Sequence, residues 1–212
     1  MTELYLVRHG QSESNLLNIY AGHLDSPLSE TGKIQAKLLV NYFKDIHIDA
    51  IVSSDLLRAY GTIFPTAKDH GIEIIKNRNL REIYAGQWEG VEFSVLEREY
   101  EKDYSVWLND IPNAVCTGGE SVRELSDRIT NEMNKIIAEY DGKTVVVASH
   151  GMPIKVLCSI WKTGNLESIR DASWAPNASV THILFTDGKP DIINEFDTSH
   201  LAGFLTNLPD NV

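Results

Sequence analysis

The stretch Leu4-Tyr5-Leu6-Val7-Arg8-His9-Gly10 begins with four apolar residues and ends in a cation, an imidazole and a glycine. The stretch Val145-Val146-Val147-Ala148-Ser149-His150-Gly151 follows a similar pattern. Unbroken aliphatic runs of this length are typical of strands that are covered on both faces of a parallel sheet. Because ligands of open parallel sheets bind beyond the carboxyl ends of the strands, we expect His9 and His150 to face each other there.

Further strands and helices follow the same alternation. Short apolar runs at 50–52 and 72–75 predict two more strands, and helical patterns begin after Ser29 and after the capping-box pair Ser121 and Glu124. Near the end of the chain, an alternating run at 179–185, the turn Asp187-Gly188 and the run at 191–196 predict an antiparallel hairpin. The predicted fold class is therefore α/β, a three-layer α/β/α sandwich with a mostly parallel sheet and an antiparallel edge.

The chain length of 212 residues fits one α/β domain with an insertion or two small domains. We expect a single domain over 1–212 with a helical lid insertion at about 91–118. That insertion carries four aromatic residues and six acids: Phe93, Tyr100, Tyr104, Trp107, Glu92, Glu97, Glu99, Glu101, Asp103 and Asp110. An ordinary amphipathic surface helix is the alternative interpretation of the same segment.

Composition and charge exclude several classes of protein. Nineteen Lys and Arg against thirty Asp and Glu give a net charge of −11, which argues against partners that are nucleic acids or anionic membranes. No apolar run approaches the 18 residues of a membrane span. The two cysteines, Cys116 and Cys158, form no CxxC pair and predict free thiols. We expect a cytoplasmic protein that is a monomer or a homodimer.

Arg58 stands out because of its expected place in the fold. It falls in the first turn of the helix that follows the 50–52 strand, where the helix macrodipole disfavours a cation. A bound anion would remove this conflict, and Arg8, Arg58 and exposed backbone N–H groups would then form a phosphate cradle. The alternatives are a surface ion pair for Arg58 and two unrelated histidines at the strand ends.

Several motifs, in order along the chain, resemble those of the histidine phosphatase superfamily, in its phosphoglycerate mutase-like branch. The first is Leu6-Val7-Arg8-His9-Gly10-Gln11-Ser12-Glu13-Ser14-Asn15, and the others lie at 21–29, 53–59, 80–90, 118–121 and 148–151. The resemblance implies that His9 is a nucleophile that becomes a phosphohistidine and that Glu82 is the general acid. It further implies that Arg8, Arg58 and His150 surround the phosphoryl oxygens and that Asn15 and Gly22 make secondary phosphate or substrate contacts.

The resemblance also implies that the reaction needs neither a metal nor an organic cofactor. We add Gly151 to the expected phosphate contacts, because a glycine lets the backbone approach a ligand closely. The chain departs from the family pattern in having His23 where relatives often have Trp and Gly61 where many have Gln. Pro65 is expected to kink its helix.

Elementary chemistry sets two conditions on these roles. A nucleophilic histidine must be neutral, and neighbouring Arg8 and Arg58 disfavour its protonated form. An unperturbed glutamic acid, with a pKa of about 4.3, is protonated only about 0.2% of the time at pH 7. The pKa of Glu82 must therefore be raised, by burial or by the substrate charge, if Glu82 is to protonate a leaving group.

The predicted function is metal-independent hydrolysis of a small phosphorylated metabolite, by a phosphomonoesterase of the histidine acid type. One alternative is a cofactor-dependent phosphoglycerate mutase, although such enzymes are usually longer and carry an Arg-Arg pair after the acid, where this insertion has only Arg98 and Lys102. A non-catalytic module that binds a phosphorylated ligand is the other alternative. Because the insertion is acidic, we expect monoesters to be preferred over bisphosphates.

Overall fold

The computed structural model describes residues 1–206 and contains one six-stranded sheet. The strands are β1 (Thr2–Arg8), β2 (Ala50–Ser53), β3 (Ile74–Lys76), β4 (Thr144–Ser149), β5 (Val180–Thr186) and β6 (Lys189–Asp197). Their order is β3-β2-β4-β1-β5-β6, in which the first four are parallel and β5 and β6 are antiparallel to their neighbours. The predicted parallel sheet with an antiparallel edge is confirmed.

The register of the two central strands brings the two His-Gly pairs together. β1 and β4 pair in parallel, with Arg8 opposite Ser149, and the His9 N–H donates to the Ser149 carbonyl at 3.0 Å. His9 and His150, the next residues along each strand, therefore lie side by side at the carboxyl edge. The expected convergence of the two histidines is confirmed.

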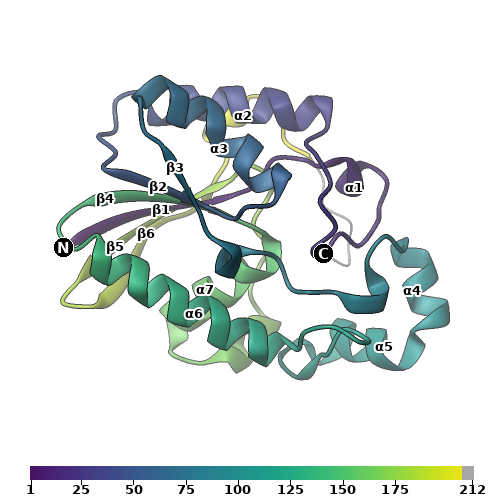
Figure 1. The fold of residues 1–212 in the computed structure, drawn as a ribbon. Coiled ribbons are helices and arrows are strands. Elements are labelled where there is room, and N and C mark those ends of the chain that lie inside the picture. The colour runs from purple at the N-terminus through teal and green to yellow at the C-terminus, as the bar shows by residue number, and fades with distance from the viewer. Residues whose placement is uncertain (207–212) are drawn as a thin grey trace.

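Helices cover both faces of the sheet and complete three layers (Figure 1). They are α1 (Glu13–Leu16), α2 (Glu30–Phe43), α3 (Leu57–His70), α4 (Phe93–Glu99), α5 (Glu101–Asn109), α6 (Val122–Glu139) and α7 (Gly151–Thr163). Short 3-10 turns span Arg78–Leu80, Gly86–Trp88, Ile111–Asn113, Leu166–Arg170 and Ser199–Leu201. α2 and α3 lie on one face, whereas α6 and α7 lie on the other.

Each face of the sheet has its own apolar core, since successive strand residues point to opposite faces. Tyr5 and Val7 of β1 pack in the core under α2 and α3. Leu4 and Leu6 of the same strand pack in the core under α6 and α7. Burial on both faces explains why β1 and β4 are unbroken apolar runs.

The N-terminal helix caps that the sequence predicts are present. The Ser29 side chain accepts the N–H of Gly32 at the start of α2, and Ser121 and Glu124 make a reciprocal capping box at the start of α6. α3 continues through Pro65 without interruption and ends at Gly71, which adopts a positive φ of 67°. Both cysteines are free and buried.

The insertion forms α4, α5 and the following 3-10 turn, and it lies beyond the carboxyl edge of the sheet (Figure 1). Phe93 and Trp107 reach the pocket described below, whereas Tyr104 is 1% exposed and belongs to the core. The helical character of the insertion is thus confirmed, and its role as a lid stays a prediction.

Within residues 1–206, no helix is long and apolar enough to cross a membrane.

Candidate active site

A pocket opens at the carboxyl edge of the sheet, beneath the insertion. Six of the eight residues expected to form the site line it: Arg8, His9, Asn15, Gly22, Arg58 and Glu82. The other lining residues are Ser12, Ile19, Tyr20, Ala21, Phe93, Trp107, Met152 and Trp174. The pocket therefore joins a small charged floor to a wall that is largely apolar and aromatic.

His9 is held in one tautomer. Its Nδ1 lies 2.7 Å from the Gly10 carbonyl oxygen, and because a carbonyl can only accept, Nδ1 must carry the hydrogen. The lone pair of the neutral ring is then on Nε2. Burial, together with the charges of Arg58 and Arg8, lowers the pKa of His9 well below its ordinary value. The ring is thus neutral at pH 7, as a nucleophile requires.

Arg8 and Arg58 are buried cations with exposed fractions of 2% and 1%. Arg8 donates to the Ala175 carbonyl, and Arg58 donates to the carbonyls of Gly22 and Leu24 at 2.7 and 2.9 Å. Burial lowers the pKa of each guanidinium to about 10, so both remain charged at pH 7. Neither contacts a carboxylate within hydrogen-bond distance in the described structure, which leaves a cationic floor suited to an anion.

The N-terminus of α3 differs in one respect from the sequence argument. Arg58 is in the first turn, as expected, and no acid lies in that turn. However, the Asp25 carboxylate, from a distant loop, accepts the Leu57 N–H at 2.7 Å and thereby offsets the positive end of the helix macrodipole. A bound anion is therefore not needed to explain a cation at this helix start, and it is the burial of the Arg58 charge that favours an anion here.

Gly22 needs its lack of a side chain. Its φ is +50°, and a Cβ atom would lie 2.6 Å from the Glu89 carboxylate and 2.7 Å from the Ala85 Cβ. Because the Gly22 carbonyl holds Arg58, this tight turn fixes one side of the cationic floor. Glu89 accepts the His23 and Ala85 N–H groups and so has a structural role in the turn after Glu82.

Glu82 stands on the pocket wall in an irregular segment between two 3-10 turns. Its carboxylate accepts the N–H groups of Ile83 at 2.9 Å and Met152 at 3.3 Å. Burial raises the pKa of the carboxyl above its ordinary value, and it outweighs the opposing effects of these donors and of the two arginines. This is the direction of shift that a proton donor at this position requires.

His150 and Gly151 lie behind the pocket and do not line it. The His150 ring is fully buried, its centroid is 5.2 Å from that of His9, and its Nε2 lies 2.7 Å from the Ser54 hydroxyl. Burial and the charge of Arg58 lower the pKa of His150 well below its ordinary value. A Cβ on Gly151 would lie 3.3 Å from the Arg8 guanidinium carbon, so this glycine gives Arg8 room.

Sequence reasoning missed the loop that precedes β5. Trp174 lines the pocket, and the Ala175 carbonyl accepts from Arg8. Asn177 donates to the His9 carbonyl at 3.2 Å and to Asn15 at 3.3 Å. The signal that the sequence offers here is the run at 177–184, which weakly resembles the family pattern, because a loop this far along the chain shows no periodicity that would place it.

Two buried arginines, a neutral histidine and a carboxyl of raised pKa, at one edge of a three-layer sandwich, are groups suited to binding a phosphoryl group. Comparison with known proteins agrees with this chemistry. The model of the histidine phosphatase superfamily (branch 1) matches residues 4–198. Within residues 1–206, no three His, Cys, Asp or Glu side chains lie together as metal ligands.

Three relatives are similar over most of the chain. Phosphoserine phosphatase 1 of Hydrogenobacter thermophilus is 36% identical over 157 residues, which are 74% of each chain. The structure of Bacillus stearothermophilus YhfR has a TM-score of 0.90 at 27% identity and covers 95% of this chain and 100% of that one. The structure of Entamoeba histolytica phosphoserine phosphatase with phosphoserine has a TM-score of 0.84 at 28% identity, with the same coverage.

The chain belongs to the histidine phosphatase superfamily. Its phosphatase relatives support a histidine-type phosphomonoesterase, a hydrolase in the phosphoglycerate mutase family.

Proposed function

We propose that the chain hydrolyses small phosphomonoesters without a metal, through a phosphohistidine on His9 and with Glu82 as the general acid and base. The observation that carries this proposal is the state of His9. A neutral ring whose Nδ1–H is tied to a carbonyl presents the Nε2 lone pair next to two buried cations.

The proposed first step is in-line attack of His9 Nε2 on phosphorus. The bond from phosphorus to the ester oxygen breaks, and the leaving oxygen takes its proton from Glu82. Arg8 and Arg58 neutralise the charge on the phosphoryl oxygens, with His150 behind His9 as a further group near them. In the second step, Glu82 takes a proton from water as the water attacks the phosphohistidine, which releases phosphate and restores both residues.

The nucleophile is tested by brief incubation with a ³²P-labelled substrate followed by rapid denaturation. A phosphohistidine gives an adduct that is labile in acid and stable in base, and the label is absent from the His9→Ala variant. Equal labelling of that variant refutes the assignment. Turnover that survives extensive treatment with EDTA is expected if no metal takes part.

Small monoesters are the proposed substrates because Arg8 and Arg58 are the only cations among the described residues that line the pocket. A second phosphate would meet aromatic side chains such as Phe93 and Trp107 instead. Since two of the relatives are phosphoserine phosphatases, phosphoserine is the first monoester to assay. Mutase turnover with 3-phosphoglycerate and 2,3-bisphosphoglycerate that exceeds phosphate release from the best monoester would favour the mutase alternative.

A further inference from the structure

The segment that carries Glu82 has no backbone ladder to hold it. It lies between the 3-10 turns Arg78–Leu80 and Gly86–Trp88 and belongs to no helix or strand. A proton donor must nevertheless stay within hydrogen-bond reach of the leaving oxygen, and a misplacement of about 1 Å costs on the order of 100-fold in rate. A main-chain bond from the Glu120 N–H to the Tyr84 carbonyl, 2.7 Å long, holds the end after Glu82, and side chains from elsewhere in the fold position the rest.

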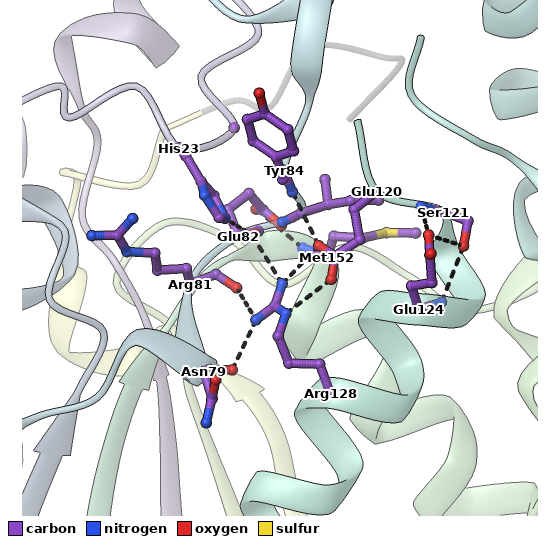
Figure 2. Close-up of polar contacts among 12 residues, drawn as sticks. His23, Asn79, Arg81, Glu82, Tyr84, Glu120, Ser121, Glu124, Arg128 and Met152 are labelled. Carbon is purple, nitrogen blue, oxygen red and sulfur yellow. Dashed lines mark hydrogen bonds and ion pairs between the residues drawn. The ribbon is translucent and has the colours of Figure 1, made fainter. Parts of the chain in front are cut away.

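Arg128 of α6 provides most of these contacts (Figure 2). Its Nη1 donates to the carbonyls of Asn79 at 2.8 Å and Arg81 at 3.1 Å, and its Nη2 donates to the carbonyl of Glu82 itself at 3.2 Å. One guanidinium thus fixes three peptide groups within four residues of chain, including the peptide group of the proposed acid.

Glu120 holds Arg128 in turn. Its two carboxylate oxygens accept from Arg128 Nε at 2.9 Å and Nη2 at 2.8 Å, a bidentate pair in which the side chains are 21% and 14% exposed. With these bonds, the five N–H groups of the guanidinium all have acceptors. The same carboxylate accepts the Tyr84 N–H at 3.1 Å, so it anchors the segment on the far side of Glu82.

His23 completes the support of the Glu82 peptide group. Its Nε2 lies 2.9 Å from the Glu82 carbonyl oxygen, and since a carbonyl only accepts, Nε2 carries the hydrogen. Figure 2 shows Arg128 below the segment, with Glu120 beside it and His23 on the other side of Glu82. The Glu82 carbonyl thus points to Arg128 and His23, while the Glu82 side chain lines the pocket.

Arg128 does not line the pocket, and it donates to the Glu82 carbonyl and not to the Glu82 carboxylate. It is therefore placed to act on the reaction through the position of Glu82. We propose that the Arg128–Glu120 pair is a positioning device that holds Glu82 in the wall of the pocket, where Glu82 protonates the leaving oxygen. This inference rests on the proposed role of Glu82 as general acid.

The test compares two substrates that differ in their need for an acid. Phosphoserine has a poor alkoxide leaving group, whereas p-nitrophenyl phosphate releases a stable phenolate that needs little protonation. For Arg128→Met we expect kcat/KM, which reports the transfer to His9 and not the later hydrolysis that Glu82 assists as base, to fall about 10- to 100-fold on phosphoserine and less than threefold on p-nitrophenyl phosphate. KM should change less than twofold on either substrate, because Arg128 contacts no substrate.

Arg123→Met is the matched control. Arg123 lies on the same helix and pairs with Glu167 at 2.7 Å, but its side chain is 54% exposed and it makes no contact with the Glu82 segment. This variant should keep both activities. Arg128→Lys keeps the charge but lacks the planar set of five donors, so its phosphoserine activity should fall between those of the wild type and Arg128→Met.

Glu82→Gln separates the two proposals. If Glu82→Gln loses kcat/KM equally on both substrates, the role of Glu82 as acid fails. If Glu82→Gln is selective for phosphoserine and Arg128→Met is not, only the positioning inference fails. In the double variant Glu82→Gln/Arg128→Met, the Arg128→Met change should lower activity on phosphoserine by less than a further threefold, because a misplaced glutamine has no proton to give. Fully additive losses refute the inference.

If Arg128→Met unfolds, the same comparison is made with Arg128→Lys and Glu120→Gln, where equal losses on both substrates again refute it.

Discussion

Arg8→Met should leave the protein at least as stable as the wild type while abolishing most of its activity. Arg8 is 2% exposed, and burial lowers its pKa to about 10. A lowered pKa in a cationic group means that the folded state disfavours the charge, so the cost is present at pH 7 and disappears only above pH 10. At about 1.4 kcal/mol for each pKa unit, the cost is about 3 kcal/mol.

The opposing effect is the loss of one hydrogen bond. Without Arg8, the buried Ala175 carbonyl loses its guanidinium donor, and leaving such a group unsatisfied costs about 1–3 kcal/mol. Methionine keeps much of the buried apolar volume beside Gly151. The free energy of unfolding of Arg8→Met should therefore lie between that of the wild type and about 2 kcal/mol above it. Truncation of a buried side chain usually lowers this free energy instead.

Urea unfolding at pH 7 measures this balance, and the assay of kcat should show a fall of about 10²- to 10³-fold from the loss of one transition-state charge contact. Inorganic phosphate at 100 times its Kd should stabilise the wild type by about 2.7 kcal/mol and the variant far less. The exposed Arg123 gives a control: without phosphate, Arg123→Met should not be more stable than the wild type, and phosphate should stabilise it as much as the wild type because its site is intact. The reasoning is refuted if the free energy of unfolding of Arg8→Met is more than about 1 kcal/mol below that of the wild type, or if its turnover is within threefold of the wild type.

Three further predictions follow from the site. Because the pKa of His9 is lowered, the acid limb of kcat/KM should lie below pH 6.5, and a limb above pH 7 would contradict a neutral nucleophile. Because the pKa of Glu82 is raised, kcat on phosphoserine should fall at alkaline pH as the donor deprotonates, and Glu82→Gln should remove that limb. Gly22→Ala should lower both Tm and kcat because of its contact with Glu89, whereas Gly71→Ala, which also has positive φ but nothing within 4 Å, should lower Tm less and leave kcat unchanged.

The sheet was predictable because the unbroken apolar runs of its central strands indicate burial on both faces. β1 and β4 are covered on both faces, so their apolar runs identify them without reference to the rest of the chain. Their parallel pairing follows from the helical patterns between them. With that pairing, the convergence of His9 and His150 needs no further information.

The surroundings of Glu82 were not predictable in the same way. The sequence around Glu82 does not reveal that burial raises the pKa of its carboxyl or that Arg128 donates to its peptide carbonyl. Both depend on contacts between residues that are tens of positions apart in the chain. Glu120 stood in a quoted motif, but Arg128 lies outside every motif. Trp174 was missed for a similar reason, since it enters the pocket from a loop whose course is set by bonds from Arg8 and Asn177.

The buried charges also explain how the proposed reaction acquires its proton. A phosphate dianion entering the pocket raises the pKa of Glu82 further, since like charges disfavour the carboxylate, and it raises the pKa of His9 as well. His9 begins well below its ordinary value and Glu82 begins above its own, so the same charge favours protonation of Glu82 while Arg8 and Arg58 oppose protonation of His9. Substrate binding thus favours the protonated form of Glu82, which takes its proton from solvent, and leaves His9 neutral, as the proposed phosphoryl transfer to His9 requires.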